Sequence, residues 1–232
     1  MSAREKIASL MTSPFTIISV ISLIFTISIF TGNIGTLLGF VVVIFTLWAI
    51  KWDWSYFGIQ RNPFLQTLLK ALLYTLLIIL VNDVLFQPAI ELFFGETDLT
   101  ALDGIRGNLL NYLVFILIMW VVAAFGEEFL YRGYMCKGLA RIFGNTRLAW
   151  SAAIIISSSV FGFAHLYQGM SGVITTAFVA IIFGVIFYRN QKNLWIGILT
   201  HGIYDVFGIT LIFLEKELII TNWAQEHIFF FI

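Results

Sequence analysis

The feature that most constrains this chain is a series of seven long apolar stretches that fill most of its length. A helix needs about 20 mostly apolar residues to cross the hydrocarbon core of a membrane, where backbone groups must pair within the helix. The stretches cover residues 14–31, 34–50, 66–90, 108–135, 148–165, 171–188 and 194–214. They predict an all-α polytopic membrane protein with about seven transmembrane helices, within a range of six to eight.

The composition agrees with a membrane protein and excludes several other classes. Only 11% of the 232 residues are charged, whereas soluble proteins average about 25%. The formal net charge is zero, so the chain has no basic footprint for nucleic acid. The single cysteine, Cys136, excludes an internal disulfide and a CxxC metal site. The expected partner is therefore the lipid bilayer, and the sequence carries no signal for an oligomeric state.

The chain divides into three predicted parts of one membrane domain. Residues 1–107 hold the first helices, an aromatic segment from Trp52 to Arg61 that is expected to lie on the membrane surface, and an acidic loop. Residues 108–214 form a core that carries the functional candidates, and residues 215–232 form a short interfacial tail.

The distribution of cations predicts the orientation. With seven spans, all of the 13 Lys and Arg residues except Arg106 and Lys216 fall on or near the side of the N-terminus. Cytoplasmic loops of membrane proteins are enriched in Lys and Arg. We therefore expect a multi-pass protein of the plasma (cell) membrane with a cytoplasmic N-terminus and an external C-terminus.

Few ionisable residues lie inside the predicted spans, and such residues are functional candidates by default. Apart from Lys70, near the cytoplasmic start of its span, they are Asp83, Glu127, Glu128, Arg132, His165, His201 and Asp205. Asp83 stands apart from the others in the sequence. We expect it either to pair with Arg106 or to line a cavity.

The spacing of these residues predicts specific contacts. Glu128 and Arg132 are four residues apart, so on a helix they face each other and can form an ion pair. Glu127 points in another direction and stays freer to handle a proton. His201 and Asp205 are also four residues apart, so the carboxylate can orient the imidazole. Phe161 and His165 share one helix face in the same way.

Three motifs in this order resemble those of the CPBP (Abi) family. Glu127–Arg132 matches EExxxR, Phe161–His165 matches FxxxH, and His201–Asp205 matches HxxxN/D. This family includes CAAX prenyl endopeptidases of the Rce1 type and bacterial bacteriocin-processing or self-immunity proteins. The resemblance covers about residues 108–212. The prenyl endopeptidases usually carry asparagine where this chain has Asp205.

The resemblance implies hydrolysis of a peptide bond within the membrane by a glutamate-activated water. The substrate would be a membrane-associated peptide or protein, either prenylated or leader-bearing. Glu127 is then the general base, and His165 shares its water. Glu128 and Arg132 hold the helix end rigid. His201 donates to the developing oxyanion, while Asp205 either orients His201 or acts on the oxyanion itself. The cavity is expected at mid-membrane, open to the cytoplasm.

The sequence leaves the cofactor and two other functions open. A metal-independent glutamate mechanism is the first choice, so no cofactor is required. Zinc is the alternative, with Glu127, His165 and His201 as its ligands. A bacteriocin self-immunity or scaffold protein without turnover is the alternative function. An ion- or proton-coupled transporter that uses the same cluster ranks below it.

Overall fold

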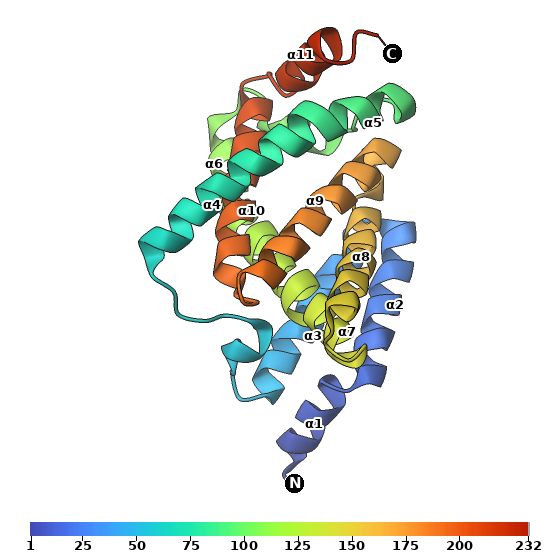
Figure 1. The fold of residues 1–232 in the computed structure, drawn as a ribbon, viewed down its shortest axis with the longest axis vertical. Coiled ribbons are helices and arrows are strands. Elements are labelled where there is room, and N and C mark those ends of the chain that lie inside the picture. Colours follow the sequence, from blue (N-terminus) through green and yellow to red (C-terminus); the bar gives the residue numbers. More distant parts are fainter. Residues whose placement is uncertain (232) are drawn as a thin grey trace.

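The computed structural model describes residues 1–231, in which all regular structure is helical and the helices pack side by side as a bundle (Figure 1). The α-helices are α1 (Ala3–Met11), α2 (Pro14–Thr31), α3 (Ile34–Ala49), α4 (Phe64–Ile78), α5 (Gln87–Phe94), α6 (Leu109–Ile118), α7 (Lys137–Ile142), α8 (Arg147–Ala164), α9 (Gly169–Arg189), α10 (Leu194–Phe213) and α11 (Ile219–His227). Short 3₁₀ turns are η1 (Trp54–Phe57), η3 (Thr100–Ile105) and η5 (Leu166–Gln168). Two wider, π-helical segments are η2 (Ile79–Phe86) and η4 (Met119–Cys136).

The π-helical segments lie inside two long continuous helices. One runs 31 residues through α4, η2 and α5, and the other runs 34 residues through α6, η4 and α7. Both exceed the roughly 20 residues that cross a bilayer, so these helices must tilt or extend beyond the hydrocarbon core. Figure 1 shows the first of them as a diagonal helix along the bundle. The second extends beyond its predicted end at residue 135.

The prediction of an all-α polytopic membrane protein is confirmed. Six helices in the described residues are long and apolar enough to cross a membrane, and all seven predicted stretches are helical. The exception in length is α3, whose 16 residues span about 24 Å. With α3 included, seven helices could cross the membrane. The first and last helices, α1 and α11, lie at opposite ends of the bundle (Figure 1).

Side-chain caps fix where several of these helices begin. The hydroxyl of Ser13 accepts the N–H of Thr16, and Pro14 occupies the first helical position of α2, where its missing N–H costs nothing. Thr146 caps α8 and Asn193 caps α10 in the same manner. The turn between α2 and α3 uses Gly32, whose φ of 62° is readily adopted by glycine.

The outer surface of the bundle is apolar. On α4, five leucines are between 47% and 65% exposed, namely Leu65, Leu69, Leu72, Leu73 and Leu76. In water, such a continuous apolar face would drive association. In a bilayer it is the face that lipid solvates, as expected for a multi-pass membrane protein.

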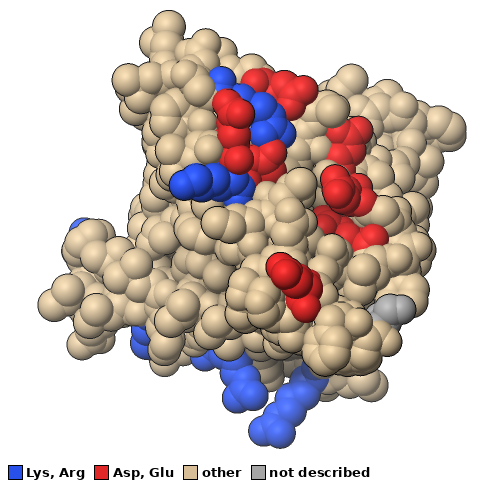
Figure 2. Space-filling view, turned by 90° about the horizontal axis from the view of Figure 1, so that it is seen from above, with Lys and Arg blue, Asp and Glu red and all other residues tan. Residues whose placement is uncertain are grey.

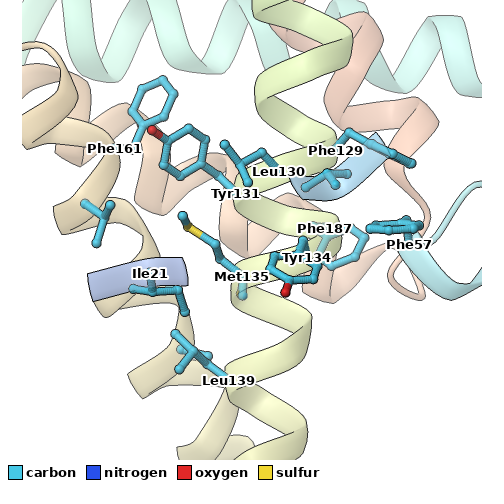
Figure 3. Packing of buried hydrophobic residues seen from close by; sticks show 14 of the residues in the cluster. Ile21, Phe57, Phe129, Leu130, Tyr131, Tyr134, Met135, Leu139, Phe161 and Phe187 are labelled. Atoms are coloured by element: carbon cyan, nitrogen blue, oxygen red, sulfur yellow. The ribbon is translucent and has the colours of Figure 1, made fainter. Parts of the chain in front are cut away.

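The motif-bearing segment η4 lies at the centre of the core (Figure 3). Leu130, Tyr131 and Met135 are at most 1% exposed, and neighbouring elements close around them. The ring of Phe57 in η1 stacks on Phe129 with 4.3 Å between centroids. This part of the aromatic segment, which was expected on the membrane surface, therefore packs into the bundle, while Trp52 and Trp54 stay exposed.

The two ends of the bundle differ in charge. Basic residues gather at the end with the N-terminus, where Arg141 contacts the backbone of Thr12 and Lys137 contacts the backbone of Tyr56. Acidic residues spread over the opposite face, which carries the loop before η3 and the connection to α11 (Figure 2). We call this second surface the acidic face. Its acidic residues are Glu96, Asp98, Asp103, Glu215, Glu217 and Glu226.

Candidate active site

Three helical elements bring the motif residues together. Segment η4 carries Glu127, Glu128 and Arg132, His165 ends α8, and α10 carries the last two motif residues. Close packing sets the distance between η4 and α10. A Cβ placed on Gly202 would lie 2.3 Å from the ring of Trp120, so only glycine leaves room for the indole there. Wide helical turns of the η4 type are frequent at functional sites.

Glu128 is fully buried and holds two partners from different helices. Its Oε1 lies 2.9 Å from Nη1 of Arg132, which is the ion pair expected from their spacing. The same oxygen lies 3.1 Å from Nδ1 of His201. Its Oε2 has no hydrogen-bond partner and sits 2.9 Å from where a Cβ on Gly197 would stand. Glu128 is therefore a structural link between η4 and α10, with no free access to water.

Arg132 is 2% exposed, and its guanidinium makes a hydrogen bond and two cation–π contacts. Its Nη2 donates to the carbonyl of Ala180 at 3.0 Å. The guanidinium lies over the rings of Phe161 and Phe183, with 5.1 and 5.2 Å to their centroids. Such cation–π contacts strengthen when the cation is removed from water. Arg132 therefore joins η4 to α8 and α9 as well as balancing the charge of Glu128.

His201 is oriented differently from the expectation. Its Nδ1–H donates to Glu128, and Asp205 stands on the other side of the ring, with Oδ2 3.5 Å from Nε2. The ring also stacks on Phe183 at 4.8 Å between centroids. The prediction that Asp205 orients this imidazole was therefore incomplete, because the shorter contact comes from Glu128. With Nδ1–H used in this way, Nε2 can donate a proton only when the ring carries both protons.

Glu127 has a different environment from Glu128. Its side chain is 12% exposed and lines the cavity described below. Its Oε2 lies 3.9 Å from Nε2 of His201, which is too long for a hydrogen bond. Glu127 makes no side-chain hydrogen bond to any described residue. Its carboxylate is thus free to bind a water molecule next to the imidazole.

His165 lies at the end of α8, with its ring beside that of Phe161. Its Nδ1–H donates to the carbonyl of Phe161 at 2.9 Å, and the two rings are 4.6 Å apart at their centroids. The predicted shared face of Phe161 and His165 is therefore present. The ring of Phe161 lies 6.4 Å from that of His201. His165 lines the same cavity, with Nε2 as its free nitrogen.

A cavity of about 480 Å³ connects these residues to the acidic face. Glu127, His165, His201 and Asp205 line its inner part, mostly among apolar side chains. Residues of the acidic face line its outer part, including Thr97, Leu99, Glu217 and Thr221. The cavity was expected to open toward the same end as the N-terminus. In the structure the lining extends to Ile220 and Thr221 of α11, at the other end of the bundle from α1 (Figure 1). The side of the membrane that this end faces stays a prediction.

The side chains as placed do not fit the zinc site considered from the sequence. Within residues 1–231, no three His, Cys, Asp or Glu side chains are grouped so that they could hold one metal ion. His201 and Glu127 approach each other, whereas His165 is turned onto the backbone of its own helix. No chemical step is therefore routed through a metal.

A second polar cluster in the cavity lies outside the three motifs. Tyr204 donates its hydroxyl to Oδ1 of Asp83 at 2.6 Å, and Asn82 donates to the same oxygen at 2.9 Å. All three residues line the cavity. Asp83 thus lines the cavity and does not pair with Arg106, which contacts Asp103 and Glu217. The polar pair Asn82–Asp83 inside an apolar run was the available sequence signal.

Comparison with protein-family models gives one match. Residues 109–207 match the family described as type II CAAX prenyl endopeptidase Rce1-like. The resemblance inferred from the three motifs is confirmed. The match covers the three motifs and lies within the predicted core of residues 108–214. Comparison with curated proteins and with solved structures gave no match.

The Rce1-like match bears on the broad function classes. It supports a CAAX-type protease in general, and the apolar helices place that protease in a membrane as an integral, multi-pass protein. Neither the immunity or scaffold alternative nor the transporter alternative is favoured by this match.

Proposed function

We propose that this Rce1-like protein is an intramembrane endopeptidase that uses Glu127 to activate a water molecule. The observation that carries the proposal is the contrast between two adjacent carboxylates. Glu128 is buried and committed to Arg132 and His201, whereas Glu127 faces the cavity without a hydrogen bond to a described residue. A general base needs this freedom to hold and deprotonate water.

The proposed reaction proceeds in two steps. Glu127 takes a proton from water, and the resulting hydroxide adds to the carbonyl carbon of the scissile peptide bond. The carbonyl oxygen becomes an oxyanion, toward which the doubly protonated His201 donates from Nε2. Glu127 then passes its proton to the amide nitrogen, the C–N bond breaks, and the products are a carboxylic acid and an amine.

The remaining motif residues would support this reaction without forming bonds to carbon. Asp205 lies 3.5 Å from Nε2 of His201, where its charge favours the doubly protonated ring. Nε2 of His165 can accept a hydrogen bond from the attacking water. Glu128 and Arg132 keep the η4 helix and the imidazole in place. We do not assign the oxyanion contact to Asp205, because a carboxylate cannot donate unless it is protonated.

The proposed substrate is a membrane-associated peptide, prenylated or leader-bearing, that reaches the cavity from the lipid or from the acidic face. We also place the N-terminus in the cytoplasm of the plasma membrane, because basic residues gather at that end. The catalytic cavity would then open toward the outside of the cell.

Cleavage assays with the purified protein in liposomes test the proposed function. The two peptides are a farnesylated C-terminal peptide and a leader-bearing bacteriocin precursor, and mass spectrometry identifies the products. We expect at least one of them to be cut at a single internal bond, with the mass of one water added across the two fragments. Recovery of both peptides intact under conditions where the protein stays folded would count against the proposal.

A further inference from the structure

The cavity has an unusual charge balance for a site expected to take a free C-terminal carboxylate. Four carboxylate side chains line it, from Asp83, Glu127, Asp205 and Glu217. No lysine or arginine among residues 1–231 lines it. Glu217 pairs with Arg106, and Glu127 and Asp205 lie near His201, whereas Asp83 has no cationic partner among the described residues. A carboxylate ligand buried beside Asp83 would therefore meet a like charge, which is costly in a low-dielectric cavity. A cationic ligand would instead be attracted by the carboxylate.

The second polar cluster gives this charge a specific location. Both hydrogen bonds received by Asp83 go to Oδ1, one from Tyr204 and one from Asn82. The other carboxylate oxygen, Oδ2, accepts no hydrogen bond from a described residue, and Asp83 lines the cavity. The network that joins η2 to α10 therefore uses only half of the acceptor capacity of Asp83.

Asn82 adds an independent observation. This residue is only 2% exposed and lines the cavity, and its Oδ1 has no hydrogen-bond partner. Its amide orientation is set by the two bonds from Nδ2, to Asp83 and to Tyr204. The flipped orientation would place Oδ1 against the carboxylate of Asp83. A buried amide oxygen without a donor is uncommon in folded proteins and indicates a missing partner.

We propose that Asn82 and Asp83 form a subsite for a basic side chain, lysine or arginine, of the peptide substrate. Such a side chain supplies several N–H donors and a positive charge. It would pair with the carboxylate of Asp83, and a shift of the Asn82 side chain would bring the buried Oδ1 of Asn82 within reach of the same donor. This inference rests on the proposed function, because its ligand is the substrate of the same cavity.

The rim of the cavity suits the approach of such a substrate. Both the hydroxyl and the backbone N–H of Thr100 donate to Asp98, which lowers the pKa of that carboxyl and keeps it ionised at neutral pH. Figure 2 shows acidic side chains spread over this face, with Lys and Arg beside some of them, and the acidic residue Glu217 of this face lines the cavity. Surface charge of this kind attracts oppositely charged ligands and is weakened by salt.

Peptide binding measured by fluorescence anisotropy tests the subsite directly. The probes are short apolar peptides that are acetylated, amidated and labelled with a neutral dye, and they differ only in a central Lys, Met or Glu. The lysine ammonium is then the only cation. We expect the wild type to bind the Lys peptide about tenfold more tightly than the Met peptide, and the Glu peptide most weakly. Equal binding of the Lys and Met peptides would overturn the proposal.

Two variants and a matched control test whether Asp83 causes the preference for the Lys peptide over the Met peptide. Asp83→Asn should bind the Lys and Met peptides within about twofold of each other. Gln87→Lys, one turn away on the cavity wall, should place a tethered ammonium beside Asp83 and remove the preference without touching the carboxylate. Glu226→Gln removes the same charge from exposed α11 and should keep the preference. An unchanged preference in Gln87→Lys would contradict the subsite even if Asp83→Asn fails to fold.

The same peptides and variants distinguish a failure of the subsite proposal from a failure of the proposed function. Glu127→Gln protein is included in the binding experiment, where it should keep the Lys preference while cutting nothing. A Lys preference in a wild type that cleaves no peptide would support the subsite and count against the protease. Cleavage without any Lys preference would support the protease and overturn the subsite.

Discussion

Oε1 of Glu128 lies 3.1 Å from Nδ1 of His201, although the two residues are 73 positions apart in the chain. The contact crosses from η4 to α10 and is buried on both sides. It gives the second glutamate of the EExxxR motif two tasks, since the same oxygen also neutralises Arg132. The first glutamate is thereby left as the one carboxylate of the pair that can act on water.

Removing Arg132 should destabilise the protein strongly. Arg132→Met leaves the buried carboxylate of Glu128 without its cation, and such a loss costs about 3–5 kcal/mol. We expect a large decrease in the unfolding midpoint in detergent, measured by tryptophan fluorescence against denaturant. An unfolding midpoint equal to that of the wild type would show that the ion pair is not structural.

The double variant separates lost charge pairing from lost packing. Glu128→Gln with Arg132→Met removes both charges of the pair, so neither partner is left as a buried charge without the other, and Asp205 still lies beside His201. We expect this protein to be more stable than Arg132→Met alone. If the two single effects simply add, Glu128 and Arg132 do not act as a pair.

Gly197 should be required for the position of Glu128. In Gly197→Ala the new methyl group would lie 2.9 Å from Oε2 of Glu128, against a neighbour that cannot move freely. We expect loss of cleavage together with reduced thermal stability. Gly208→Ala is the matched control on α10, because nothing lies within 4 Å of its Cβ position. The control should be neutral or more stable by up to about 1 kcal/mol, from helix propensity.

The orientation can be read by labelling introduced cysteines in intact cells. In a Cys136→Ala background, Glu96→Cys marks the acidic face and Lys51→Cys marks the basic end, and both positions are exposed. A membrane-impermeant maleimide should label Glu96→Cys from outside and Lys51→Cys only after permeabilisation. The reverse pattern would place the N-terminus outside and the cavity mouth in the cytoplasm.

Metal removal should leave the activity intact. No three His, Cys, Asp or Glu side chains in the described chain are grouped so that they could hold one metal ion. We expect cleavage to continue at the same rate after dialysis against a zinc chelator. Loss of cleavage that returns on adding zinc would show that the site rearranges around a metal.

The sequence predicted the helices and the local contacts because both depend on short-range spacing. The apolar runs placed all seven predicted helices, and the four-residue spacing predicted the pair of Glu128 with Arg132 and the shared face of Phe161 with His165. Such periodic patterns are set by the helix itself and do not require knowledge of the neighbours.

The contacts between helices could not be predicted in this way. Nothing near His201 in the sequence indicates that Glu128 binds its ring, because that contact depends on how η4 packs against α10. The close contact between Gly202 and the ring of Trp120 also depends on how η4 packs against α10, so local spacing does not predict it. The contribution of α11 to the cavity lining was likewise not predicted, because it depends on how α11 and the loop before η3 fold over the bundle.

The most direct test of the account compares cleavage by Glu127→Gln with cleavage by the wild type, using whichever peptide the wild type cuts. Glu127→Gln keeps the size of the side chain and removes the base. We expect the rate to fall by at least about 10²-fold, because general-base catalysis contributes that much, while the unfolding midpoint stays unchanged. Glu226→Gln should cleave normally. Wild-type cleavage by Glu127→Gln would contradict the proposal that this carboxylate activates the water.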